Sequence, residues 1–121
     1  MESGWLAYAQ VLAGRKHYQQ ASELASRFGV APELPPAVDQ KPLAELRRNL
    51  LINTNDYVTG LALYQATMTA NNPADALAVL RELTLQTDCP RYFWYLRARL
   101  EMQQAAWEAA WHAWERYLAN L

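Results

Sequence analysis

The chain has 121 residues, of which 52% are hydrophobic and 12% aromatic, so it has the composition of one globular domain and not of a disordered tail. Eleven Lys and Arg against twelve Asp and Glu give a formal net charge of −1, which leaves no basic excess for nucleic-acid phosphates or acidic membrane surfaces. The single cysteine, Cys89, excludes an intramolecular disulfide, and no secretory signal or membrane-length apolar run is found. We therefore expect a cytoplasmic protein with no nucleic-acid or membrane partner.

The first two predicted helices each carry residues at positions i, i+3, i+4 and i+7, which lie on one face of a helix. Gly29 follows the second stripe, at the place where a left-handed C-cap would end the helix. Prolines then exclude a helix over about residues 30–41, because proline lacks the amide donor and clashes with the preceding turn. The two stripes are Trp5, Tyr8, Ala9 and Leu12, and Tyr18, Ala21, Ser22 and Ala25.

Five further helices are expected after this proline-rich loop. One has a particularly clear start, because Asn72 can cap the helix with its side chain and Pro73 suits the first turn. No segment alternates apolar and polar residues as a half-buried strand would. The sequence therefore predicts an all-α protein of about seven helices. The five approximate ranges are 43–51, 56–70, 73–87, 90–104 and 106–120.

The predicted helices form hairpins with an internal periodicity. Ala76 and Ala110 take the same place in their hairpins, and their separation in the sequence defines a period of about 34 residues. Ala21 takes that place in the first hairpin, and it precedes Ala76 by one such period plus an insert of about 21 residues. The fullest pattern of large and small residues occurs in the last hairpin, at Trp94, Ala98, Trp107, Ala110 and Trp114.

These residues resemble the tetratricopeptide-repeat (TPR) superfamily, whose unit of about 34 residues places small side chains where helices cross and aromatic side chains beside them. The middle unit departs from the pattern, because Gly60 stands for the tryptophan and Tyr64 for the small residue. The resemblance implies one domain in which antiparallel hairpins stack as a short right-handed array. An alanine-rich bundle unrelated to the family is the alternative. The domain would cover 1–121, with units at about 2–35, 56–90 and 91–121 and an insert at about 30–55.

No arrangement of catalytic or metal-binding residues emerges from the sequence. His17 and His112 lack a second ligand at helical spacing, so surface histidines are favoured over a metal site, which needs three or four convergent donors. Cys89 has no histidine close to it in the sequence, which favours a structural thiol over a nucleophile. Neither a nucleophile elbow nor a glycine-rich phosphate loop occurs. We therefore expect no enzyme activity, no metal and no cofactor.

Basic and aromatic residues gather on the sixth predicted helix. Such a cluster can stack on nucleic-acid bases, but this one is small and the chain is acidic overall. The TPR resemblance implies instead that the first helix of each unit lines a groove for a protein or peptide; the alternative is that these residues pack against the insert. The implied groove residues are Leu6, Gln10 and Ala13 in the first unit, Leu61, Gln65 and Met68 in the second, and Tyr92, Tyr95, Arg99 and Met102 in the third.

The resemblance also implies an exposed apolar face on the last helix, because the second helix of a TPR unit is covered by the next unit and none follows here. The expected face is Ala110, Trp114, Tyr117 and Leu121, with Trp107, Trp111 and Leu118 turned toward the helix's own hairpin partner. The expected function is a non-catalytic module that binds a protein or peptide. The alternatives are a scaffold that forms a homodimer through this face, or a fragment of a larger repeat protein.

Overall fold

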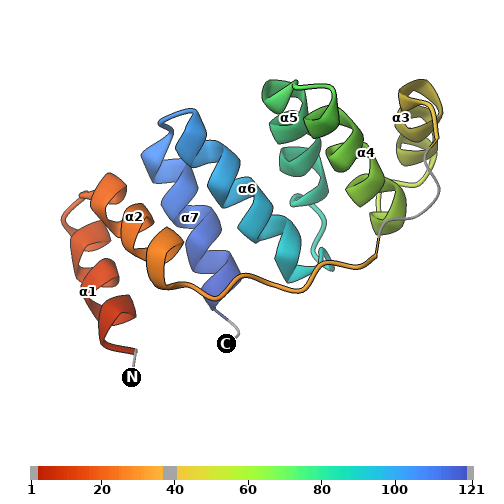
Figure 1. Cartoon of the computed structure of the whole chain (residues 1–121). Coiled ribbons are helices and arrows are strands. Elements are labelled where there is room, and N and C mark those ends of the chain that lie inside the picture. The colour runs from red at the N-terminus through yellow and green to blue at the C-terminus, as the bar shows by residue number, and fades with distance from the viewer. Residues whose placement is uncertain (1–2, 37–40, 120–121) are drawn as a thin grey trace. The chain divides into compact units, whose positions relative to one another are not determined.

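The computed structural model describes residues 3–36 and 41–119, and this part of the chain contains seven α-helices and no strand, which confirms the all-α prediction. No helix within these ranges is long and apolar enough to cross a membrane. The helices are α1 (Ser3–Gly14), α2 (Tyr18–Phe28), α3 (Leu43–Ile52), α4 (Tyr57–Thr69), α5 (Pro73–Leu83), α6 (Arg91–Gln103) and α7 (Trp107–Leu118) (Figure 1).

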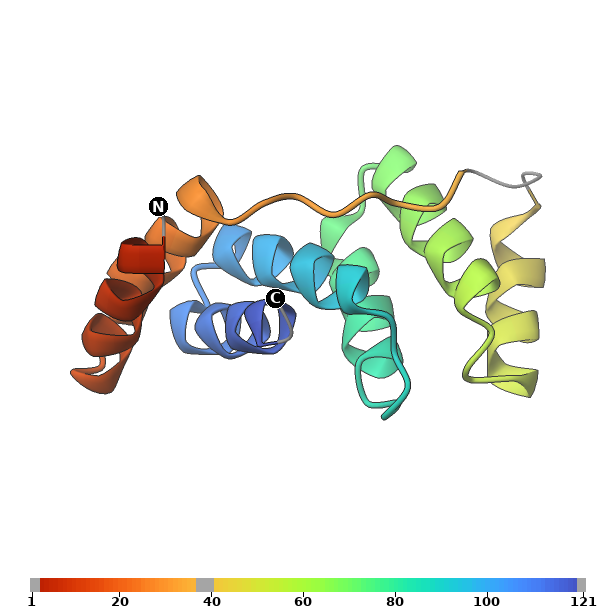
Figure 2. The same ribbon diagram turned by 90° about the horizontal axis from the view of Figure 1, so that it is seen from below.

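The chain divides into two compact units. Unit 1 comprises Met1–Glu33 and Trp94–Leu121, and unit 2 comprises Leu34–Phe93. We expected a single domain with its hairpins stacked in chain order. Instead, unit 1 joins the first hairpin to the last one, with α2 packed against both α1 and α7 (Figure 1). In unit 2, α4 packs against both α3 and α5, as the yellow and green helices of Figures 1 and 2 illustrate.

The core of unit 1 combines alanines with a few large side chains. Alanine lets neighbouring helices approach closely, and the aromatic rings fill the remaining volume with large buried areas. The ring of Tyr95 on α6 contacts both Trp114 and Tyr117 on α7, with centroid distances of 5.5 and 5.3 Å. The buried members of this core are Ala9, Ala21, Ala25, Ala98, Trp111, Ala113, Trp114, Tyr117 and Leu118.

The two sides of α7 are interchanged relative to the prediction. Trp114 and Tyr117 are 1% and 3% exposed and turn toward α6, the helix's own hairpin partner. The other side of α7 meets α2, where the Ser22 hydroxyl donates to the carbonyl of Trp107 at 3.4 Å. Leu118 lies on that side too, because a Cβ added at Gly29 would be 3.9 Å from its Cδ2.

The expected self-association face at Ala110, Trp114 and Tyr117 is therefore wrong, since all three are buried inside unit 1. The physical reason is that α6 covers this side of α7, while α2 packs on the other side. Leu121, the fourth residue of that expected face, lies outside the described residues.

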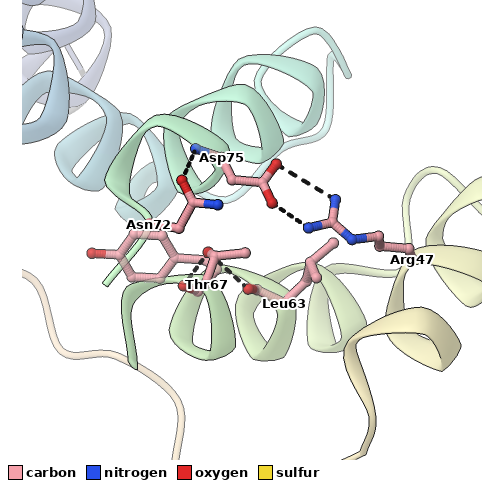
Figure 3. Close-up of polar contacts among 6 residues, drawn as sticks. Arg47, Leu63, Thr67, Asn72 and Asp75 are labelled. Carbon is pink, nitrogen blue, oxygen red and sulfur yellow. Dashed lines mark hydrogen bonds and ion pairs between the residues drawn. The ribbon is translucent and has the colours of Figure 1, made fainter. Parts of the chain in front are cut away.

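Side-chain caps start α4 and α5 of unit 2 where the sequence predicts these helices to begin. Asp56 accepts the amide of Thr59 at 3.2 Å at the start of α4, and Asn72 accepts the amide of Asp75 at 3.3 Å at the start of α5 (Figure 3). Each cap satisfies an amide that has no partner within its helix. The cap expected at the end of α2 is different, because Gly29 has φ −69° and ψ 139°, an extended conformation instead of a left-handed one.

The turns of the three hairpins α1–α2, α4–α5 and α6–α7 share one geometry. Each contains a residue with positive φ, namely 67° at Lys16, 60° at Asn71 and 57° at Ala105. The amide of each of these residues donates over 2.9 Å to the carbonyl three residues earlier. Each turn is followed, five residues later, by a fully buried alanine, and these alanines are Ala21, Ala76 and Ala110.

Candidate interaction surfaces

The residues of the implied groove are divided between the two units. Leu61 is only 4% exposed and offers a partner almost no surface, whereas Gln65 and Met68 on the same helix are half-buried. Leu6, Gln10, Ala13, Tyr95, Arg99 and Met102 belong to unit 1, whereas Leu61, Gln65, Met68 and Tyr92 belong to unit 2.

The arginines on α6 contact the aromatic and acidic side chains of unit 1. Arg99 donates to the Tyr95 hydroxyl at 3.1 Å, and its guanidinium lies 5.7 Å from the centre of the Tyr95 ring. Arg97 Nε donates over 3.1 Å to Glu101, a carboxylate with no exposed surface. Because a buried carboxylate needs a hydrogen-bonded partner, Arg97 has a structural role in unit 1.

The indole of Trp94 on α6 lies beneath two guanidinium groups. Those of Arg97 and Arg116 are 5.4 and 4.8 Å from the ring centre, within the range of cation–π attraction. Arg116 comes from α7, so this contact ties the two helices of the hairpin together. Arg97, Arg99 and Tyr95 of the basic and aromatic cluster on α6 are therefore engaged in contacts within unit 1.

An apolar groove that the sequence did not predict lies in unit 2. It encloses about 260 Å³ between the C-terminal halves of α3 and α5, with Leu63 of α4 also lining it. We call it the α3–α5 groove. Its apolar lining is Leu50, Leu51, Leu63, Val79, Leu83 and Leu85, and its polar lining is Arg47, Thr54, Glu82 and Gln86.

Both edges of the α3–α5 groove expose large apolar side chains. Leu51 is 78% exposed and Leu85 is 76% exposed, although both line the same concave surface. Two other leucines of α3 turn inward, since Leu46 is 3% exposed and Leu50 is half-buried. Leu51 instead stands at the surface, where an apolar side chain of this size is available to a partner.

An ion pair joins α3 to α5 beside this groove. Arg47 forms a two-pronged contact with the carboxylate of Asp75, with Nη1 to Oδ1 at 3.5 Å and Nη2 bonded to Oδ2 (Figure 3). The hydrogen bond to Asp75 raises the pKa of Arg47, so the guanidinium stays charged. Below this pair the buried hydroxyl of Thr67 donates over 3.0 Å to the carbonyl of Leu63, so this part of α4 carries no unsatisfied hydroxyl (Figure 3).

The chain that follows α5 carries Leu85 and is held by a tyrosine of α4. The hydroxyl of Tyr57 donates to the carboxylate of Asp88, and its ring lies 5.9 Å from that of Phe93. Partial burial and the hydrogen bond to Asp88 raise the pKa of Tyr57. Burial, followed by the nearby Cys89 thiol, raises the pKa of Tyr92 as well. These contacts fix the segment that forms one wall of the α3–α5 groove.

Both histidines are exposed, as their sequence context predicts. His112 lies between two carboxylates of its own helix, 3.6 Å from Glu108 and 3.2 Å from Glu115. Within residues 3–36 and 41–119, no three His, Cys, Asp or Glu side chains gather as a metal site requires.

Comparison with protein-family models, with curated proteins and with solved structures finds no match to this chain. The function therefore has to be inferred from the surfaces of the chain itself. The best defined of these is the α3–α5 groove, because it is concave, apolar and edged by exposed leucines.

Proposed function

We propose that the chain is a non-catalytic interaction module that binds an amphipathic helical segment of another protein in the α3–α5 groove. The observation that carries this proposal is the pair of exposed leucines, Leu51 and Leu85, on the edges of one apolar groove. A groove between two helices is a recurring site for the apolar face of a third helix. With a single cysteine, the chain can form no intramolecular disulfide that an oxidising compartment would maintain. We therefore also propose a cytoplasmic location.

The chemistry of the groove restricts its occupant. Fully burying an exposed leucine contributes about 1.5–3 kcal/mol, which is less than the cost of association, estimated at about 4–15 kcal/mol. The partner must therefore add apolar anchors that fill the groove. Glu82 is exposed on the α5 side, whereas Arg47 on the α3 side is already paired with Asp75. We expect the partner to carry a basic residue that faces Glu82, because complementary rim charges favour the correct register.

The recurring hairpin turn supports the TPR resemblance. The positive-φ residues Asn71 and Ala105 are separated by one repeat period of about 34 residues, and Lys16 precedes Asn71 by the same longer interval that separates the first two buried alanines. We propose that the three hairpins are degenerate repeats of one unit. The packing of α2 on α7 departs from a stack in chain order, so the right-handed array is not part of this proposal.

The experiment is selection from a library of displayed random peptides against the wild-type protein. We expect the enriched peptides to share apolar residues at spacings of three and four, the pattern of one helix face. Leu51→Asp and Leu85→Asp should each lower the affinity of the protein for the selected peptides by about tenfold or more, since each replaces an apolar anchor by a charge.

Ile52→Asp is the matched control. Ile52 is 79% exposed and follows Leu51 directly on α3, but it does not line the groove. Binding should survive this change. Equal losses in all three variants, or selected peptides that bind Leu51→Asp as tightly as the wild type, would contradict the proposal.

A further inference from the structure

The helix α1 is apolar on both of its faces. It contains no charged side chain between Ser3 and Gly14, and only its inner face, centred on Ala9, contributes to the core of unit 1. Its outer face leaves Tyr8 59% and Val11 52% exposed. A solvent-facing helix normally carries charged residues on its outer face, whereas the only strongly polar side chain that α1 exposes between Gly4 and Gly14 is Gln10.

The outer face also contains glycines that the chain itself does not require. A Cβ added at Gly4 or Gly14 would meet nothing within 4 Å, and neither residue has a positive φ. Gly4 is the second residue of α1 and Gly14 is its last, and no contact within the chain requires a glycine at either position. Gly4, Ala7, Val11 and Gly14 are separated by three, four and three residues, the spacing of the seam between two packed helices.

A shallow depression of about 440 Å³ adjoins this face between α1 and α2. Tyr8 and Leu12 line it from α1, and α2 contributes Glu23 and Arg27, which lie one helical turn apart. Glu23 accepts a hydrogen bond from Gln19 at 3.3 Å, and the guanidinium of Arg27 lies 5.9 Å from the Phe28 ring. The rim of the depression therefore carries one negative and one positive group on the same helix face.

We propose that this surface binds a second copy of the chain, with the two α1 helices packed antiparallel about a two-fold axis. Tyr8 of each copy enters the depression of the other. In such an isologous contact the same patch of each copy meets, so a charged residue on the axis would face the identical residue of the other copy and be repelled by it. The seam of α1 carries none, and Glu23 of each copy can face Arg27 of the other. This charge complementarity identifies a second copy as the occupant.

The dimer is expected to be weak. A specific interface of standard size uses about 20–30 residues on each side, and the surface described here is considerably smaller. We therefore expect dissociation at roughly micromolar concentrations. Sedimentation velocity from low to high micromolar concentration should show a reversible monomer–dimer equilibrium.

The two charges provide a sharp test. Glu23→Arg alone and Arg27→Glu alone should each weaken self-association, because like charges then meet twice across the axis. An equimolar mixture of these two variants should associate again, because every facing pair is then of opposite sign. Tyr8→Asp should weaken the dimer by about tenfold or more, since it removes the aromatic anchor.

Val30→Asp is the control within unit 1, because Val30 is 75% exposed but lies outside this surface. Leu51→Asp is the control for the α3–α5 groove, and both controls should dimerise as the wild type does. A wild-type chain that stays monomeric, a dimer insensitive to Tyr8→Asp, or a charge-variant mixture that fails to associate would each overturn the proposal. Because Tyr8 is largely exposed, its replacement should leave the helical circular-dichroism signal unchanged.

Discussion

Gly60 of α4 lies directly beneath the side chain of Leu83 on α5, so closely that a Cβ at Gly60 would be 2.7 Å from Leu83 Cδ2. Leu83 is 1% exposed and therefore has little room to move aside. The glycine lets the two helices of this hairpin pack at this separation.

We expect Gly60→Ala to destabilise the protein. Overpacking of a buried contact typically costs about 1–3 kcal/mol, and the better helix propensity of alanine returns only about 0.5–1 kcal/mol. The melting temperature should fall. Gly14→Ala is the control, because a Cβ there would meet nothing within 4 Å, and its melting temperature should not fall. A rise in the melting temperature of both variants would show that Leu83 does not restrict this site.

The turn between α6 and α7 is strained by an alanine in the left-handed region. Ala105 has φ 57°, a conformation that costs an L-residue about 1–2 kcal/mol and that glycine adopts freely. Ala105→Gly should therefore raise the free energy of unfolding by about 0.5–1 kcal/mol after the entropy loss of glycine is counted.

Urea denaturation followed by circular dichroism would measure this gain. Ala109→Gly provides the contrast, since Ala109 lies inside α7, where glycine costs about 1 kcal/mol relative to alanine. The two substitutions are chemically identical and should change stability in opposite directions. Destabilisation of similar size in both would contradict the backbone conformation of the turn.

Tyr57 should make the stability of unit 2 sensitive to alkaline pH. Its pKa is raised in the folded chain by partial burial and by the hydrogen bond to Asp88, whereas an unfolded tyrosine titrates near about pH 10. Above that pH the folded state binds more protons than the unfolded state, so stability falls as pH rises. The stabilisation by Tyr57 is fully present below the pKa of the unfolded tyrosine. It is lost as the pH rises through the pKa of Tyr57 in the folded chain.

The comparison with Tyr57→Phe isolates this contribution. At neutral pH the variant should melt at a lower temperature than the wild type, because it lacks the hydrogen bond to Asp88. The difference between the two melting temperatures should shrink as pH rises above about 10, since phenylalanine does not titrate. A difference that stays constant through this range would show that the Tyr57 hydroxyl does not hold its proton in the folded state.

The sequence by itself determined the helices, because their starts and stops depend on local chemistry. Asn72 and Pro73 fix the beginning of α5, and prolines end helical structure after α2. The spacing of Ala21, Ala76 and Ala110 likewise located equivalent buried positions, because each lies at a fixed distance from a turn of the same geometry.

Only the tertiary structure decided which side of each helix is covered. The helix α7 has one broad apolar side that includes both Trp111 and Trp114, so its sequence cannot say which of the two indoles meets α6. The sequence likewise gives no sign of the α3–α5 groove, because Leu51 and Leu85 are brought to one surface by the packing of two helices on α4. Contacts between residues far apart in the chain depend on how the helices pack, and helical periodicity carries no information about the partner.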